Sequence, residues 1–427
     1  MKEVRQFSRW IRLFLLATLT LFTIVSCQNF SPSEDAGEKV TVRLSGWGSS
    51  LVEQRLLQQV INDFEQQHPN IRVKLETIAD QYMDVVKTRL IGDAAPDVFY
   101  LDALEAPFLM AQDVLEPLDS YIKPDFEIAD FEPNLLNIFK HKNKIYGFPK
   151  DYSTLALFYS KKAFAEAGIT APPATWEELI AISKQLTIDR DGDGKPEQYG
   201  LGILPELPRL SFMIRSMGGK VVAPSGRATF ADEKSISALN PVIEQYQNDR
   251  TSVRAIDIGA NSGSEMFGQG RVAMVLEGNW MIPYLRETFP DLEYGTAEVP
   301  QVNNQPGTMV YTVAYVMDRQ SRHKPEAWEL ISYLTGKEGM DKWTGTGFAL
   351  PTRKSVAAKQ QVDRDVVRSP LVAGVKYATP WQVGDYPTVI NNQFNNQFLS
   401  ALLGEQPLEQ AMQKAQQDAN EQIRSME

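Results

Sequence analysis

Cysteine and histidine are almost absent from this chain. One cysteine, Cys27, and three histidines, His68, His141 and His323, occur in 427 residues. A single cysteine cannot form a disulfide within the chain. The histidines lie in polar or helix-end surroundings, so the sequence offers little for a zinc site or a histidine-based catalytic triad.

Basic residues are in the minority, and the formal net charge is −11. Removing residues 1–26 takes away four basic side chains and one acidic one, which leaves a net charge of −14. This charge argues against nucleic acid as a partner, since nucleic acid binds to basic surfaces. It also argues against a body that lies flat on anionic lipid. No GxxxxGK motif is present to cradle a phosphate.

The only long apolar run is residues 13–25, which follow a basic segment that contains Arg9 and Arg12. A membrane-spanning helix needs about 20 residues, so this run has instead the length of a signal-peptide h-region. Ser26-Cys27 ends it and resembles the bacterial lipobox, with Ile24 as a mild departure. We expect residues 1–26 to be a lipoprotein signal peptide and Cys27 to be lipidated. An ordinary cleaved signal or an uncleaved anchor is the alternative.

The segment after Cys27 is polar and has no apolar stripe through residue 38. Such a composition cannot bury enough surface to become ordered. We therefore expect residues 27–38 to be a lipidated cysteine with a flexible tether. The folded body would work outside the cytoplasm, close to a membrane.

Apolar residues alternate with polar ones at 40–44 and 71–75, and 97–101 is a short apolar run. These patterns predict three strands. Helical periodicity between them, at 52–64 and 80–92, predicts two crossover helices. Strands that alternate with helices indicate a parallel sheet with right-handed crossovers.

A second α/β region begins after residue 149. Strands are expected at 155–159, 272–276 and 312–317, and amphipathic helices from Pro325 and over 408–423. Thr175, with Glu178 three residues later, predicts a capping box that opens another helix. The mature chain of 400 residues is long enough for two sizeable cores.

Several stretches appear in the order found in one family. They are APDVFYLD at 95–102, YGFPKDY at 146–152, FYSKKAF at 158–164, DGDGKPEQYG at 191–200, GRVAM at 270–274 with GNW at 278–280, and GFALPTRKS at 347–355. With the lipobox, they make the chain resemble the extracellular sugar-binding proteins of ABC importers, the maltodextrin-binding group.

The resemblance implies an α/β, two-lobed periplasmic-binding-protein fold in which each lobe is a sheet flanked by helices. Residues 39–151 with 313–355 would form the N-terminal lobe, and 152–312 with 356–427 the C-terminal lobe. Hinges near 151–154 and 311–315 would close the lobes over a ligand in the cleft between them. The closed form of a monomer would then dock on the transmembrane subunits of a permease.

A sugar site needs aromatic platforms together with carboxylates, amides and arginine. In parallel sheets, ligands bind beyond the carboxyl ends of the strands. Residues of these types follow predicted strands, occupy the crossings or lie in glycine-rich turns; Trp381 and Asp385 are added only because the resemblance implies an aromatic residue of the second lobe late in the chain. Our candidate ligand residues are Trp47, Ser49, Asp102, Asp151, Tyr152, Gly278, Asn279, Trp280, Tyr311, Phe348, Arg353, Trp381 and Asp385.

Structural roles compete with these assignments. Asp102 could cap a helix at 103–111, and Arg353 could only brace a hinge through an ion pair. Trp176, Trp328 and Trp343 lie on predicted helices at core spacing, so we expect them to serve packing.

Residues 189–194 resemble the first half of a calcium loop, with alternating acidic residues and a glycine at the sixth position. The twelfth position is Gly200 instead of glutamate. Calcium could be held by Asp189, Asp191, Asp193 and Glu197. The competing interpretation is an acidic surface turn, since Asp-Gly pairs commonly form turns.

Two other functions stay open. A secreted carbohydrate-active enzyme would need two carboxylates that face one bond; Asp102, Asp151 and Glu277 are candidates, but no motif places them together. A receptor for another polar solute, such as glycerol phosphate, would favour clustered basic residues. The candidate loops carry mostly acidic and aromatic groups, which favours a neutral sugar. We therefore expect a receptor without enzymatic activity. We expect no cofactor apart from calcium.

Overall fold

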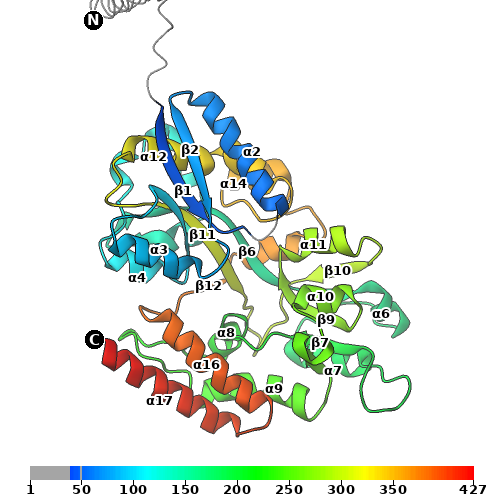
Figure 1. Cartoon of the computed structure of the whole chain (residues 1–427). Coiled ribbons are helices and arrows are strands. Elements are labelled where there is room, and N and C mark those ends of the chain that lie inside the picture. The colour runs from blue at the N-terminus through cyan, green and yellow to red at the C-terminus, as the bar shows by residue number, and fades with distance from the viewer. Residues whose placement is uncertain (1–38, 49–50) are drawn as a thin grey trace, which may run out of the picture.

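The computed structural model describes residues 39–48 and 51–427, so Cys27, the tether and Ser49 lie outside the described residues. Ten strands form one sheet whose main path is β2-β1-β3-β11-β6-β9-β7-β8. Strand β10 pairs with β6, and β12 pairs with β11. Figure 1 shows the chain as two halves, an upper half of mostly blue, cyan and yellow elements and a lower half of mostly green, orange and red ones.

The first half begins with the three parallel strands that the sequence predicts. Strand β1 pairs in parallel with β2 on one side and with β3 on the other. Val42 and Leu44 are fully buried, as the alternating pattern requires. The elements are β1 (Val40–Gly46), α2 (Leu51–Gln67), β2 (Ile71–Thr77), α3 (Tyr82–Ile91) and β3 (Val98–Asp102). The predicted strand–helix alternation is confirmed.

Short elements complete the first half. Between β3 and the first crossing strand lie α4 (Ala106–Ala111), the 3-10 helices η1 (Asp119–Tyr121), η2 (Pro124–Phe126) and η3 (Ile128–Asp130), α5 (Pro133–Leu136), η4 (Asn137–Phe139), and the hairpin of β4 (Lys140–His141) and β5 (Lys144–Ile145). Later in the chain, α12 (Lys324–Leu334), α13 (Lys337–Thr344) and α14 (Lys354–Gln360) return to it.

Two long strands run from one half into the other. They are β6 (Gly147–Ser160) and β11 (Met309–Met317), which pair antiparallel with each other. Residues 147–154 of β6 pair with β11, and residues 155–159 pair with β9. The sequence predicts only 155–159 as a strand here, because Pro149 and the polar residues before 155 obscure the pattern. The two halves are therefore linked by backbone that belongs to both.

The second half contains parallel strands as well. Strand β7 lies between β9 and β8, parallel to both. Its elements are α6 (Lys161–Glu166), α7 (Trp176–Leu186), β7 (Tyr199–Ile203), α8 (Leu207–Ser216), α9 (Glu233–Gln247), β8 (Ser252–Arg254), η5 (Ala255–Ile258), α10 (Gly263–Gly268), β9 (Val272–Gly278), α11 (Met281–Thr288), β10 (Tyr294–Ala297), α15 (Ser369–Gly374), β12 (Thr379–Pro380), α16 (Pro387–Leu402) and α17 (Leu408–Met426).

Helix α7 shows half of its predicted capping box. The Thr175 side chain accepts a hydrogen bond from the Glu178 N–H at 3.2 Å. The Glu178 carboxylate, however, accepts from the N–H of Ala174 at 2.7 Å, one residue before the N-cap. The helix therefore starts where predicted. The second contact of the capping box differs from the prediction, because the carboxylate binds the N–H of Ala174 instead of that of Thr175.

The lobe boundaries stay predictions, and the change of pairing partners within β6 supports the first of them. The third boundary, at 355/356, falls inside α14, which packs on α13 of the first half. Since a helix moves as a unit, we propose that this boundary lies beyond Gln360.

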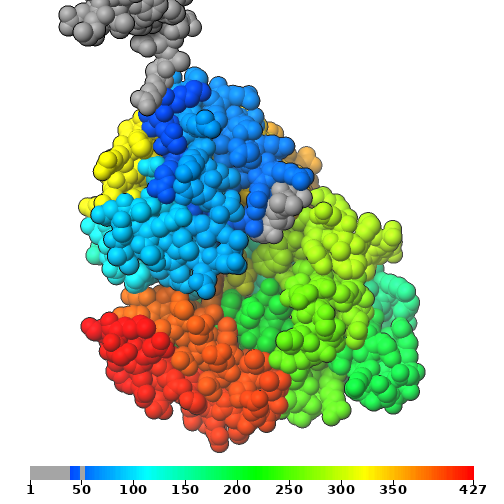
Figure 2. Space-filling view, viewed as in Figure 1, coloured from blue at the N-terminus to red at the C-terminus, as the bar shows by residue number. Residues whose placement is uncertain are grey.

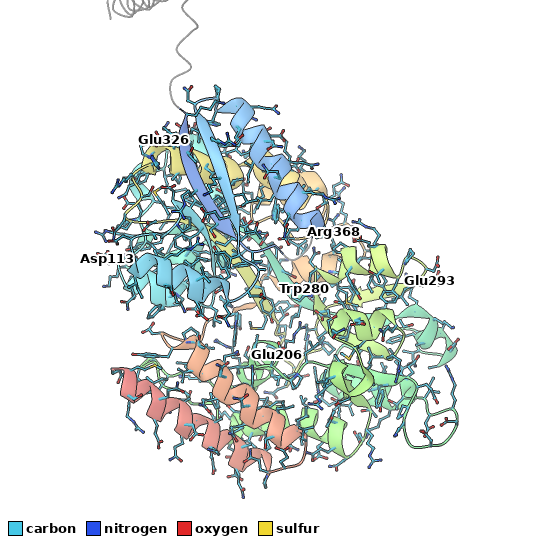
Figure 3. All side chains as sticks on the ribbon, viewed as in Figure 1. Asp113, Glu206, Trp280, Glu293, Glu326 and Arg368 are labelled. Atoms are coloured by element: carbon cyan, nitrogen blue, oxygen red, sulfur yellow. The ribbon has the colours of Figure 1, made fainter. Side chains whose placement is uncertain are left out.

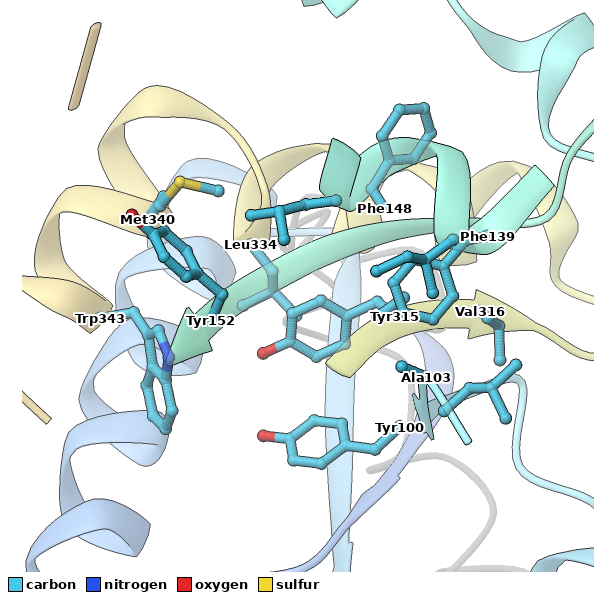
Figure 4. Packing of buried hydrophobic residues seen from close by; sticks show 14 of the residues in the cluster. Tyr100, Ala103, Phe139, Phe148, Tyr152, Tyr315, Val316, Leu334, Met340 and Trp343 are labelled. Carbon is cyan, nitrogen blue, oxygen red and sulfur yellow. The ribbon is translucent and has the colours of Figure 1, made fainter. Parts of the chain in front are cut away.

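Buried apolar side chains form two clusters. Successive residues of β6 alternate between them: Ala156 and Phe158 join the larger cluster, and Leu155 and Leu157 the smaller one. Figure 4 shows part of the larger cluster, where aromatic residues from several elements pack together. Trp176 and Trp328 are buried in these clusters, as predicted.

Candidate interlobe binding cleft

A cleft of about 550 Å³ lies between the two halves. Figure 2 shows a furrow on the surface where the upper and lower halves meet. Its walls are mainly aromatic and charged. The aromatic residues are Trp47, Tyr152, Trp280, Tyr284, Tyr311, Trp343 and Phe348, and the charged ones are Glu53, Lys150, Asp151, Arg209, Glu277 and Glu287.

In the first half, one carboxylate of the cleft is held from two sides. Oδ2 of Asp151 accepts from Nζ of Lys150 at 2.5 Å and from Nε1 of Trp343 at 2.7 Å. The ammonium group also lies 4.0 Å from the centre of the Trp343 ring, a cation–π contact. Lys150 and Asp151 are adjacent on β6, whereas Trp343 comes from α13. We call these three residues the first clamp.

The second half holds a carboxylate in the same way. Oε2 of Glu277, at the end of β9, accepts from Nε1 of Trp280 at 2.8 Å and from a guanidinium nitrogen of Arg209 at 3.3 Å. The Glu277 side chain is only 2% exposed, and Arg209 on α8 also donates to the Leu276 carbonyl at 2.9 Å. We call Glu277, Arg209 and Trp280 the second clamp.

Trp280 is the most open aromatic surface in the cleft. It is 36% exposed, and Figure 3 shows it between the two halves. Its ring meets Tyr311 edge-on at 5.6 Å between centroids. A Cβ at Gly278 would lie 2.2 Å from the Trp280 ring, so glycine is required there for the indole to fold back over the strand end. Burial raises the pKa of Tyr311 to about 12, so its hydroxyl stays protonated.

Trp47 faces the cleft from the loop that follows β1. Its ring packs edge-on against Tyr82 at 5.1 Å and Tyr100 at 5.2 Å, which fixes its orientation. A Cβ at Gly46 would lie 2.7 Å from the Tyr100 ring, so the glycine permits this close approach. The Tyr82 hydroxyl donates to the Ser45 carbonyl and accepts from the Tyr100 N–H, which ties β1 to β3 beneath the tryptophan.

Six of the candidate ligand residues line the cleft. They are Trp47, Asp151, Tyr152, Trp280, Tyr311 and Phe348. Gly278 and Asn279 lie directly beside it. Asn279 is fully buried, and its side-chain amide donates to the Gly347 carbonyl at 2.7 Å, while its N–H donates to Oγ of Ser153 at 2.7 Å. It therefore links β9 to the Phe348 loop and to β6, while its Oδ1 is buried without a hydrogen-bond partner, and its role as a ligand residue stays a prediction.

Asp102 does not line the cleft. Its Oδ1 accepts from the Glu105 N–H at 2.9 Å, in the turn that leads into α4. Asp102 thus stabilises the turn before α4, but the predicted N-cap role is wrong, because the helix begins at Ala106 and its N-cap is Glu105. Burial raises the pKa of Asp102 to about 6, because the charged form is poorly solvated there.

Arg353 is also away from the cleft. It is 2% exposed, and its guanidinium donates to the carbonyls of Thr335 at 2.6 Å and Phe126 at 2.9 Å. It pairs with Asp130 at 3.4 Å and stacks over the Phe131 ring at 4.1 Å. Placement in the cleft is therefore wrong, because four of its five N–H donors bind acceptors of the first half and it is not part of the cleft lining.

Trp381 and Asp385 are not cleft residues either. Trp381 is buried in the smaller apolar cluster, and Asp385 is exposed on the surface. Their assignment rested on resemblance alone. Neither residue lies at the end of a main strand of the sheet, where the topology brings side chains to the cleft.

Several residues that line the cleft are not among the candidates, including the three clamp residues Trp343, Lys150 and Arg209. Trp343 has helical core spacing and is 4% exposed, yet its indole N–H holds Asp151 and its ring lines the cleft. Lys150 lies in the YGFPKDY stretch, directly before the candidate Asp151. Arg209 lies on a helix remote in sequence from Glu277, and no local pattern indicates that they meet.

The acidic loop is compact. Carboxylate oxygens of Asp189, Asp191 and Glu197 lie within 4.8 Å of one another, and Asp193 is not part of this group. Both oxygens of Asp189 already accept loop N–H groups, from Gly192 at 2.8 Å and Gly194 at 2.9 Å. The four-residue calcium set is thus reduced to three exposed or half-buried carboxylates that also stabilise a turn.

No helix within the described ranges, 39–48 and 51–427, is both long enough and apolar enough to cross a membrane.

The two-lobed α/β fold with a cleft between its halves is that of periplasmic binding proteins, and several solved structures share it. An ABC substrate-binding protein of Listeria monocytogenes in complex with cycloalternan superposes with a TM-score of 0.81 at 20% identity, covering 90% of this chain and 99% of that one. An ABC transporter solute-binding protein of Thermotoga lettingae, bound with α-D-tagatose, is 26% identical, with a TM-score of 0.76 and coverage of 90% and 99%.

Residues 48–341 match the model of the bacterial extracellular solute-binding protein family, and the chain belongs to this family. A curated relative, the multiple sugar-binding protein of Streptococcus mutans, is 22% identical over 345 residues, covering 78% of this chain and 80% of its own length. The fold class and the family resemblance predicted from the sequence are confirmed.

Proposed function

We propose that this protein captures a neutral sugar in the interlobe cleft and delivers it to the permease of an ABC importer. The observation that carries the proposal is the pair of clamps, which present a carboxylate and a tryptophan from each half to one cavity. Carboxylates accept hydrogen bonds from sugar hydroxyls, and aromatic faces pack on the apolar C–H faces of a pyranose or furanose. The relatives whose names or bound ligands include sugars support this choice.

The charge of the cleft favours an uncharged ligand. Each of its two cations is paired with a carboxylate, and the remaining charged side chains of the lining, Glu53 and Glu287, are acidic. An anionic solute such as glycerol phosphate would meet no unpaired cation among these residues. An enzyme would need one of its carboxyls as a proton donor, whereas both clamp carboxylates have a cation partner that stabilises the charged form.

Capture would proceed by hinge closure. Strands β6 and β11 carry both halves, and residues such as Asp151 and Tyr311 lie on them within the cleft. A ligand that contacts both halves stabilises the closed form by its differential affinity for that form. We propose that closure then creates the surface that the permease recognises.

Sugar binding is tested by a thermal-shift screen with neutral mono- and oligosaccharides, followed by calorimetry. A ligand at 100 times its Kd stabilises the folded state by about 2.7 kcal/mol, so we expect a rise of several degrees in Tm for at least one sugar. Glycerol phosphate and uronic acids serve as anionic comparisons. A shift with an anionic compound and with no neutral sugar would contradict the proposal, as would release of a hydrolysis product.

We propose further that the mature protein is a monomer anchored outside the cytoplasm through lipidated Cys27, facing the periplasm in a two-membrane bacterium. A tether of about 11 residues would keep the receptor near its permease and raise the effective concentration for docking. Cys27→Ser is expected to release the protein from the membrane fraction and to leave sugar affinity unchanged. Fractionation followed by calorimetry checks both; membrane retention of the variant would contradict lipid anchoring.

No cofactor is needed for this function. Calcium at Asp189, Asp191 and Glu197 stays a prediction, and none of these three residues lines the cleft.

A further inference from the structure

We infer that Lys150 and Arg209 are positioning residues that hold Asp151 and Glu277 charged and fixed, each with one oxygen committed to the protein and the other available to the ligand. This inference rests on the proposed sugar-binding function. It adds how the site selects its ligand: by two pre-oriented carboxylate acceptors, one from each half, that must both meet a hydroxyl of the same uncharged molecule.

The committed oxygens are defined by direct contacts. Oδ2 of Asp151 has Nζ of Lys150 at 2.5 Å and the Trp343 indole at 2.7 Å. Oε2 of Glu277 has the Trp280 indole at 2.8 Å and Arg209 at 3.3 Å. Oε2 of Glu277 also accepts from the Gly278 N–H at 3.3 Å. Two or three donors on one oxygen prevent the carboxylate from turning. Each clamp therefore points its second oxygen in a set direction.

The second oxygens are Oδ1 of Asp151 and Oε1 of Glu277. Among the described residues, each hydrogen bond found at these two side-chain carboxylates goes to Oδ2 or to Oε2. Oδ1 of Asp151 and Oε1 of Glu277 are not among the buried polar atoms that lack a partner. Both side chains line the cleft. A hydroxyl of a bound ligand can supply the missing donor.

Glycine at position 263 leaves room for the Glu277 acceptor. A Cβ there would lie 2.4 Å from Oε1 of Glu277. Real contacts of that kind do not occur, so an alanine would push the carboxylate away from its present position without changing any charge. Gly263 thus offers a way to separate the geometry of the second clamp from its electrostatics.

The cations are needed because both carboxylates are largely removed from water. The side chains of Lys150 and Asp151 are 4% and 13% exposed, and those of Arg209 and Glu277 are 13% and 2% exposed. Burial penalises a carboxylate charge, and an adjacent cation offsets the penalty.

Other ionisable groups near the clamps do not replace these cations. Tyr100 on β3 and Tyr315 on β11 face Asp151, and burial raises the pKa of both phenols, so they stay neutral. Figure 4 shows both rings beside Trp343. Glu53 on α2 lines the same part of the cleft and is acidic.

The surroundings of Glu277 are similar. Its ionisable neighbours besides Arg209 are Glu206, the N-cap residue of α8, and Tyr311 on β11, whose pKa is about 12. No second cation therefore takes over within either of these described surroundings, and each clamp depends on one cation.

The test uses the mature full chain and the sugar identified for the wild type, titrated by calorimetry between pH 5.5 and 8. Lys150→Met is expected to weaken binding about 10-fold at both ends of this range, because the buried carboxylate loses its cation and one of the two donors that orient it. Lys150→Arg should largely restore the affinity.

Three further variants keep the inference testable if Lys150→Met folds poorly. Trp343→Phe removes one donor to Asp151 and keeps the cation, so affinity should fall without a new pH dependence. Gly263→Ala should do the same at Glu277. Lys337→Met removes a lysine from an exposed ion pair with Glu127 and is the matched control, with wild-type affinity at every pH.

Two results would overturn the inference in different ways. A folded Lys150→Met protein with wild-type affinity at pH 5.5 and pH 8 would show that the cation does not position Asp151, while sugar binding itself would stand. A wild-type protein that binds no sugar would overturn the proposed function, and the inference with it.

Discussion

Trp280→Ala is expected to lower sugar affinity about 100-fold, which corresponds to about 2.7 kcal/mol. The substitution removes the most open aromatic surface of the cleft and also the indole N–H that holds Oε2 of Glu277 at 2.8 Å. Stability should change little by comparison, because about a third of the side chain is already exposed. Calorimetric titration measures the affinity, and thermal unfolding without ligand measures the stability.

Trp280→Phe separates the two roles of this residue. Phenylalanine retains an aromatic face but cannot donate to Glu277, so its affinity should lie between those of the wild type and the alanine variant. Ile256→Ala is the matched control, since Ile256 is an exposed apolar residue (76%) outside the cleft lining. An alanine variant that unfolds would show that Trp280 serves the core; one that is stable and binds normally would exclude it from the site.

Arg353→Met should destabilise the protein by about 3–5 kcal/mol and leave sugar affinity unchanged in the fraction that is folded. The guanidinium joins segments distant in sequence, through the carbonyls of Phe126 and Thr335 and the carboxylate of Asp130. Methionine fills much of the volume but leaves these acceptors and the Asp130 charge without their donor. Denaturant unfolding reports the loss as a lower midpoint.

The neighbouring Lys354→Met is the control for this variant, because Lys354 is exposed and its replacement should not change the midpoint. Both variants keep the same backbone segment and lose one positive charge. Reduced sugar affinity with an unchanged midpoint in Arg353→Met would return this residue to the binding site and contradict the bracing role.

Much of the fold follows from local patterns. The alternation at Val42 and Leu44 predicts a strand because side chains of a strand point to opposite faces. Strands separated by helices predict parallel pairing, which β1, β2 and β3 show. The sequence predicts too short a first crossing strand. Residues 147–154 of β6 pair with β11, which lies about 160 residues later in the chain. Such long-range pairing leaves no local signal in the sequence.

The lining of the cleft was predictable where a side chain follows the end of a strand. Trp280 and Trp47 follow strands, and Asp151 lies in a crossing segment, so topology alone brings them to the cleft. Arg353, Trp381 and Asp385 were assigned by residue type within a family pattern. The sequence does not show whether the donors of an arginine face a ligand or three backbone segments. Only the packing around the arginine decides which acceptors it binds.

The sequence by itself determined the α/β class of the fold and the aromatic and acidic character of the candidate site, because these depend on periodicity, strand order and residue type. The tertiary structure decided which groups are paired. Arg209 meets Glu277, and Trp343 meets Asp151, across 68 and 192 positions of the chain. Such contacts form only when separate elements pack together, and they determine which carboxylate oxygens are left for a ligand.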